Sequence, residues 1–184
     1  EKRGLNLYLQ GVMPDEPESA FDLINLLLTS LKVENSQTLC LKVLQTYASI
    51  ACERYVVSGA ETLLKRLKLR GFKLAVISDW EPDLQELLGN LSIAKYFDYF
   101  SVSSLVGATK PSRKLFDDCI SKLSVNPADC LHIGDYYELD IVGSKSAEMH
   151  SLLFDSQNRY ANQSLPCHVV RTFDELSAYL DSVK

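Results

Sequence analysis

The chain has 184 residues, of which 46% are apolar, and its formal net charge at pH 7 is −5. This length fits one domain, or a core domain with a small insert, and the apolar share is enough for a buried core. No stretch approaches the ~20 apolar residues that a membrane-spanning helix needs. The negative charge argues against a nucleic-acid partner, since phosphate backbones are bound by basic faces.

The cysteines are odd in number and no CxxC pair occurs, so we expect neither zinc nor a disulfide framework. They are Cys40, Cys52, Cys119, Cys130 and Cys167. We expect small buried side chains in a reducing compartment, which places the protein inside the cell, in the cytoplasm. No secretory signal is recognisable. Because the chain does not begin with Met, we expect a processed form or a fragment.

The first part of the chain predicts helices. After a break at Pro14-Asp15-Glu16-Pro17, Ser19 to Leu31 is an apolar-rich helical segment. Asn35 or Ser36 can cap a second helix that runs to about Arg54. Both helices precede any strong strand signal, so we expect residues 1–55 to form a separate helical cap, incomplete at its N-terminal side.

From residue 56 onward, short apolar runs alternate with helical segments. Ser58 can cap the first helix, and Thr172 with Glu175 forms a capping box for the last. Such alternation is typical of α/β proteins with a doubly wound, Rossmann-like parallel sheet, so we expect a core domain over 56–184. The expected strands are 72–77, 99–102, 130–133, 151–154 and 167–170, and the expected helices before the last are 59–69, 82–88, 112–123 and 141–148.

Polar residues follow these strands, and ligands of open α/β sheets bind at the carboxyl ends of strands. Ser78 and Asp79 follow the first strand. The Ser78 hydroxyl can donate to a phosphate oxygen, helped by backbone N–H groups, although a lone serine here is more often a turn residue. Lys110 precedes Pro111, which favours an extended backbone. Its ammonium can balance anionic groups, although a lone lysine is usually solvated.

The segment Gly134–Asp140 is the most specific piece of the sequence. An apolar strand ends at Gly134, Asp135 follows it, and Asp140 stands ahead of a helix. Carboxylate oxygens suit Mg²⁺, which commonly takes one or two protein carboxylates and keeps several waters. The alternative is a loop whose aspartates cap the next helix, with Asp140 as the capping residue. Glu138 is expected to be a solvated loop acid.

In this order and spacing, residues 55–154 resemble the core of the haloacid dehalogenase-like hydrolase superfamily. Leu74 to Ser78 is similar to the second motif of that family, Lys110-Pro111 to the third, and Gly134 to Asp140 to the fourth. The resemblance implies a Mg²⁺-dependent phosphatase that acts on a small phosphorylated molecule through an aspartyl-phosphate, with no nucleic acid or membrane as partner. It says nothing of the oligomeric state.

The resemblance also implies a role for each site residue. Ser78 would bind the phosphoryl group, and Asp79, which stands where the family often has Asn, would be a substrate-binding residue beside it. Lys110 would steady the nucleophile and the phosphate. Asp135 would bind Mg²⁺, and Asp140 would support the metal or orient Lys110.

The nucleophile of the family is missing from this sequence. There, the first aspartate of an apolar-strand D-x-D motif attacks phosphorus, and the second is the general acid and base. No such motif precedes Ser78, and Asp15 has no second aspartate two positions on. Ser112 also stands where Asp usually follows the Lys-Pro pair. We therefore expect the chain as given to be inactive as a phosphatase.

In this family the missing motif lies on the central strand, between the strands that end at Ser78 and Gly134. Without that strand two edges would keep unpaired backbone groups inside the protein. We expect a segment upstream of Glu1 to supply it. The second possibility is that Leu5 to Met13 forms a substitute strand without catalytic carboxylates.

Two other functions fit parts of the pattern. One is a non-catalytic binding or structural module that keeps the fold, which the retained Ser78, Lys110, Asp135 and Asp140 argue against. The other is a phospho-receiver domain. Receivers place the acceptor aspartate before the Ser/Thr and Lys positions, whereas Asp135 follows both here, so the order of residues excludes it.

Overall fold

The computed structural model describes residues 55–182 and six positions nearer the N-terminus: Leu28, Ser30, Lys32, Val33, Leu39 and Lys42. The chain divides into two compact units, 1–54 and 55–184. The cap helices expected over 19–31 and from 35 or 36 to 54 lie outside the described residues, apart from those six positions. Among the described residues no helix is long and apolar enough to span a bilayer.

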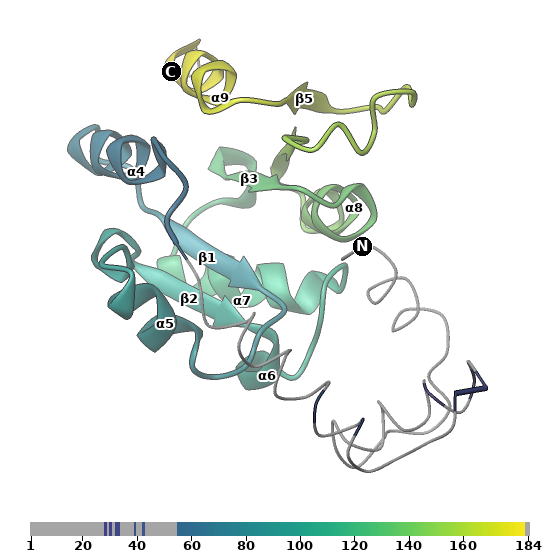
Figure 1. The fold of residues 1–184 in the computed structure, drawn as a ribbon. Coiled ribbons are helices and arrows are strands. Elements are labelled where there is room, and N and C mark those ends of the chain that lie inside the picture. The colour runs from purple at the N-terminus through teal and green to yellow at the C-terminus, as the bar shows by residue number, and fades with distance from the viewer. Residues whose placement is uncertain are drawn as a thin grey trace. The chain divides into compact units, whose positions relative to one another are not determined.

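The unit 55–184 alternates strands and helices, which confirms the expected α/β class (Figure 1). Its strands are β1 (Ala75–Ser78), β2 (Tyr99–Val102), β3 (Leu131–Gly134), β4 (His150–Phe154) and β5 (His168–Val170). Its α-helices are α4 (Ala60–Leu69), α5 (Leu84–Asn90), α6 (Ser103–Val106), α7 (Arg113–Leu123), α8 (Val142–Ser146) and α9 (Phe173–Ser182). Shorter turns are the 3-10 helices η1 (Ala94–Tyr96) and η2 (Pro127–Asp129) and the π-helix η3 (Tyr137–Ile141).

The five strands form two parallel sheets. β1 pairs with β2, with Ala75 opposite Tyr99. β4 lies between β3 and β5, with Leu131 of β3 opposite His150. Within the described residues, β1 and β3 therefore each have one edge without a strand partner. These are the two strands between which the missing central strand is expected.

Side-chain contacts join β1 to β3. Leu74, just before β1, and Leu131 and Ile133 of β3 pack against the same buried cluster. Beyond their carboxyl ends, Lys110 contacts both Asp79, which follows β1, and Asp140, which follows β3. Lys110 thus brings the residues that follow β1 and β3 together.

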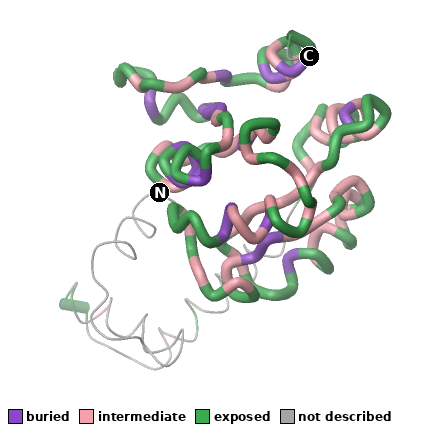
Figure 2. Tube along the Cα trace, turned by 180° about the vertical axis from the view of Figure 1, so that it is seen from behind, coloured by how far each residue is buried: buried purple, intermediate pink, exposed green. Residues whose placement is uncertain are grey.

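Burial of the strands reflects these open edges. Strands of a parallel sheet covered on both faces are normally buried, and β4 fully buries Leu152 and Leu153. In contrast, all four residues of β1 are half-buried, and β3 buries only His132 (Figure 2). The exposure of β1 and β3 is expected for strands that lack a neighbour on one side.

Helix α7 joins the two sheets. On one side the carbonyl of Leu115 accepts a hydrogen bond from Ser101 of β2, at 2.8 Å. On the other, the fully buried Phe116 ring meets His132 of β3 edge to face, with ring centroids 5.1 Å apart. A Cβ at Gly143 of α8 would lie 2.5 Å from the Phe116 ring. Glycine at that position is what lets α8 approach α7.

The element boundaries correct several sequence predictions. β2 has the predicted bounds, but β1 starts at Ala75 rather than residue 72, because the N–H of Leu74 donates to the Asp98 carboxylate at 2.8 Å. Ser58 does not cap α4, whose N-cap is Gly59 with φ 88°. The helix predicted over 141–148 forms as the shorter α8, and η3 precedes it and takes in only Ile141 of the predicted range.

The capping box of α9 forms in a modified way. The Thr172 hydroxyl accepts from the Glu175 N–H at 3.1 Å, as predicted. The Glu175 carboxylate accepts the N–H of Arg171 at 2.7 Å, one residue before the N–H that a capping box uses. Both contacts still satisfy donors at the start of the helix.

Candidate functional site

A buried ion pair lies at the centre of the candidate site. Lys110 Nζ donates to Asp140 Oδ1 at 2.7 Å, and the two side chains are 15% and 2% exposed. His132 Nε2 lies 3.2 Å from the same oxygen, and the N–H of Tyr136 donates to Oδ2 at 2.9 Å. Because an ionised carboxylate only accepts hydrogen bonds, His132 carries its hydrogen on Nε2. Three donors thus converge on one carboxylate.

These donors keep Asp140 ionised. Burial by itself raises the pKa of this carboxyl, but the hydrogen bonds from His132 and Lys110 and the charge of the ammonium outweigh burial. The pKa of Asp140 therefore lies well below its usual range. A charged carboxylate beside Lys110 holds the ammonium in a fixed place, which is what an electrostatic site requires.

The π-helix η3 and Gly134 place the Asp140 carboxylate. A Cβ at Gly134 would overlap the carboxylate, so this glycine is required by packing. Ser144 Oγ donates to the Asp140 carbonyl at 2.6 Å, which fixes the backbone. The reading of Asp140 as a helix cap is wrong, because α8 has Ile141 as N-cap and no side-chain cap. The π-turn directs the carboxylate towards Lys110 instead.

Lys110 also joins the end of β1. Its backbone N–H donates to Asp79 Oδ1 at 2.9 Å. Asp79 directly follows Ser78, the last residue of β1. Ser78 is half-buried, and its hydroxyl has no hydrogen-bond partner among the described residues. The structure thus brings Asp79, Lys110 and Asp140 into direct contact, with Ser78 adjoining them at the carboxyl end of β1.

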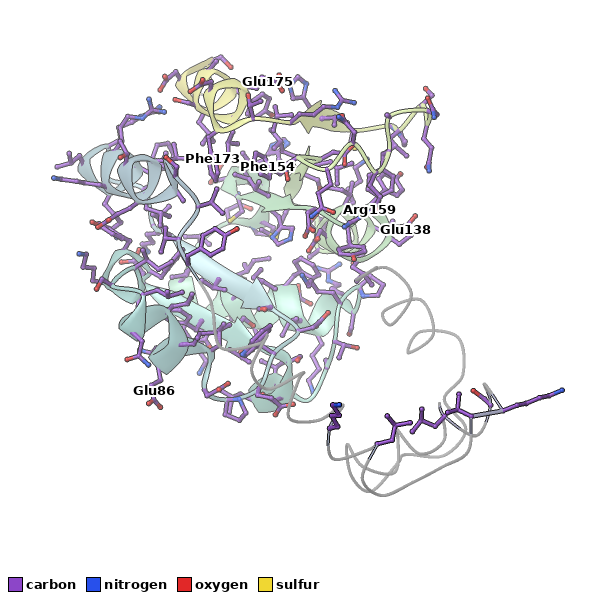
Figure 3. All side chains as sticks on the ribbon, in the orientation of Figure 1. Glu86, Glu138, Phe154, Arg159, Phe173 and Glu175 are labelled. Carbon is purple, nitrogen blue, oxygen red and sulfur yellow. The ribbon has the colours of Figure 1, made fainter. Side chains whose placement is uncertain are left out.

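Asp135 lies apart from this contact network. It directly follows β3, its side chain is 61% exposed, and Oδ2 lies 3.7 Å from Nη1 of Arg159. Arg159 Nη1 also donates to the Asp135 carbonyl at 3.1 Å, and its guanidinium lies 4.0 Å from the centre of the Tyr136 ring. Figure 3 labels Arg159, from the loop between β4 and β5, and Glu138, from the acidic loop.

The oxygen chemistry of the acidic loop fits Mg²⁺ through Asp135. Within the described residues its carboxylate accepts no hydrogen bond, so its lone pairs remain open to a ligand. Asp140 is different, because Lys110, His132 and Tyr136 already use its oxygens. The described part of the chain holds no group of three or more His, Cys, Asp or Glu that could hold a metal. One carboxylate with several waters lies within what Mg²⁺ accepts.

Sequence reasoning missed two contributors. His132 is hidden inside an apolar strand, where the one available signal was a histidine three residues before Asp135. Arg159 lies 24 residues beyond Asp135, and no local pattern connects the two. Glu138 is exposed as predicted, yet its Oε2 accepts a hydrogen bond from Tyr160 at 3.2 Å.

Comparisons with known proteins agree with the motifs. The family model of haloacid dehalogenase-like hydrolases matches residues 19–148. Haloacid dehalogenase-like hydrolase domain-containing protein 3 of Mus musculus is 39% identical over 98 residues, 53% of this chain and 39% of that protein. Glyceraldehyde 3-phosphate phosphatase of Pyrococcus furiosus is 31% identical over 110 residues, 59% of this chain and 45% of that protein. This chain therefore spans less than half the length of either relative.

The fold also has counterparts among solved structures. The crystal structure of an HAD phosphatase from Thermococcus onnurineus superposes with a TM-score of 0.66 and 21% identity. The match covers 97% of this chain and 78% of that one. At this identity the likeness shows the fold alone.

Proposed function

Because the chain belongs to the haloacid dehalogenase-like hydrolases, we propose that it forms most of a Mg²⁺-dependent phosphatase site for a small phosphorylated molecule. The observation that carries the proposal is the buried Lys110–Asp140 pair, joined through Asp79 to the end of β1. The similarity to a glyceraldehyde 3-phosphate phosphatase supports a phosphorylated metabolite as the class of substrate.

The residues at this edge have separate roles in the proposal. The hydroxyl of Ser78, which has no partner among the described residues, donates to a phosphoryl oxygen. Lys110 stabilises the charge on the phosphoryl group and on the attacking carboxylate. Asp140 orients Lys110 rather than binding metal, because its oxygens are already taken. Asp135 holds Mg²⁺. The bound ion would neutralise charge on the phosphoryl oxygens.

The nucleophile belongs on a strand between β1 and β3. Both strands have an open edge within the described residues, and one more parallel strand between them would complete a single sheet. A D-x-D motif at its carboxyl end would face Lys110. Because no such motif precedes Ser78 in these 184 residues, the chain by itself binds phosphate and metal but does not turn over substrate. Residues 1–55 would form the helical cap.

A second candidate is a non-catalytic binding module, which the missing D-x-D motif favours. The buried ion pair argues against a purely structural role. Well-packed apolar residues in place of a buried pair are often as stabilising or more so, so stability alone gives no reason for Lys110 and Asp140. Binding of an anion at Lys110 gives such a reason.

The proposal is tested by inorganic phosphate binding in the presence of Mg²⁺, followed by ³¹P NMR titration. Lys110→Met should weaken binding at least tenfold, and Ser78→Ala should weaken it severalfold. Lys122→Gln is the matched control, because it removes one positive charge at the C-terminal end of α7. That end lies near Lys73, before the start of β1, since Lys73 Nζ donates to the Leu123 carbonyl. Equal affinities for Lys110→Met, Ser78→Ala and Lys122→Gln would refute the assignment.

A further inference from the structure

The loop between β4 and β5 contacts the acidic loop through Arg159. The guanidinium is held by the carbonyl of Asp135 at 3.1 Å and by the Tyr136 ring at 4.0 Å. Its distance to Asp135 Oδ2 is 3.7 Å, which is too long for a hydrogen bond. The positive charge thus lies beside the Asp135 carboxylate while its hydrogen bond goes to the backbone.

The turn that carries Arg159 is well fixed. Asp155, only 3% exposed, accepts the N–H of Arg159 at 2.7 Å and that of Tyr160 at 3.1 Å. The buried Tyr160 hydroxyl accepts the N–H of Tyr137 at 3.0 Å and donates to Glu138. The 155–160 turn therefore holds the acidic loop at several points on either side of Tyr136.

We propose that Arg159 is a built-in counter-cation that lowers the divalent-cation affinity of Asp135. This inference rests on the proposed function, in which Asp135 holds Mg²⁺. A cation bound to Asp135 would lie within a few ångströms of the guanidinium, and like charges at that distance repel even in water. The Tyr136 ring and the Asp135 carbonyl keep the guanidinium from moving away. Arg159 thus tunes how tightly the site holds its metal.

The expected change follows from charge. Removal of the guanidinium charge should tighten Mg²⁺ or Mn²⁺ binding by about three- to tenfold at low ionic strength. The gain should shrink as salt is added, because exposed charges are screened. A lysine at this position keeps the charge but lacks the planar fork, so Arg159→Lys should bind metal within about twofold of the original chain.

The experiment measures Mn²⁺ and Mg²⁺ affinity by calorimetry at low and high salt. Neutral variants are Arg159→Gln and Arg159→Met, the second of which keeps an apolar stem over the Tyr136 ring. Lys122→Gln removes the same charge far from the site and should change nothing. Tighter binding in both neutral variants, at low salt only, is the predicted result. Unchanged or weaker binding in a neutral variant that melts like the original chain would overturn the inference.

Asp135→Asn separates this inference from the proposed function. If that variant binds metal as well as the original chain does, or if the original chain binds no divalent cation, the proposed role of Asp135 fails and the inference with it. If Asp135→Asn abolishes binding but the Arg159 variants leave it unchanged, the proposed function stands and only the role of Arg159 is wrong.

Discussion

Removal of the Lys110 charge should destabilise the fold strongly. Lys110→Met would leave the Asp140 carboxylate buried, at 2% exposure, with only the His132 and Tyr136 donors to stabilise it. Breaking a buried pair by removing one partner costs about 3–5 kcal/mol. Lys110 is still 15% exposed, so water can enter in its place and we expect the lower end, about 3 kcal/mol. For a chain of this size that corresponds to a fall of about 6–12 °C in melting temperature.

The assay is urea unfolding of the original chain, Lys110→Met, Asp140→Asn and the double variant. The double variant should lose less free energy of unfolding than the two single variants summed, because the second change removes the uncompensated charge. Lys95→Met is the control, since Lys95 and Glu61 are 3.5 Å apart and more than half exposed. Such pairs contribute about 1 kcal/mol or less. If Lys110→Met cost no more than Lys95→Met, the pair would not be the buried interaction described above.

Three further predictions concern the same unit. Because the pKa of Asp140 is lowered in the folded state, its contribution to the free energy of unfolding is fully present above about pH 4 and is lost as pH falls below that value. In urea unfolding at several pH values, Asp140→Asn should therefore lose less stability on acidification than the original chain. Gly134→Ala should lower the free energy of unfolding by about 3 kcal/mol, because a Cβ there overlaps the Asp140 carboxylate and would break its pair with Lys110. Gly89→Ala is the control: a Cβ there meets nothing within 4 Å, so the melting temperature should hardly change. Burial raises the pKa of Cys119 to about 12, so iodoacetamide followed by peptide mass mapping should modify Cys119 in the folded chain far more slowly than in urea, and equal rates would contradict its burial.

The sequence was sufficient for the class of fold, and it singled out Asp79, Lys110 and Asp140, which the structure joins by hydrogen bonds. Alternation of apolar runs predicted all five strands, and β2 has the predicted bounds. At the start of β1, a side chain from elsewhere in the chain moved the boundary. Asp98 takes the N–H of Leu74 and delays β1. At Asp140, a contact with Lys110 from 30 residues away accompanies a π-turn where a loop was predicted.

His132 and Arg159 show why the other residues around the candidate site could not be predicted from the sequence. In the sequence His132 is one residue of an apolar strand, and only the turn at η3 brings Asp140 back to it. Arg159 reaches Asp135 because β3 and β4 are adjacent in the sheet. Local spacing carries no information on such pairings, which depend on the packing of the whole unit.

The proposed function gives these 184 residues a phosphoryl-transfer site without its nucleophile. The direct test is hydrolysis of a generic aryl phosphate by the purified chain with Mg²⁺, beside an Asp135→Ala control. Loss of a nucleophile typically costs several powers of ten in rate, so the account predicts near-background rates that are equal for both chains. Turnover at ordinary enzyme rates, about 1–1000 per second, that disappears in Asp135→Ala would contradict it. Asp15 would then be the first residue to replace in search of the nucleophile.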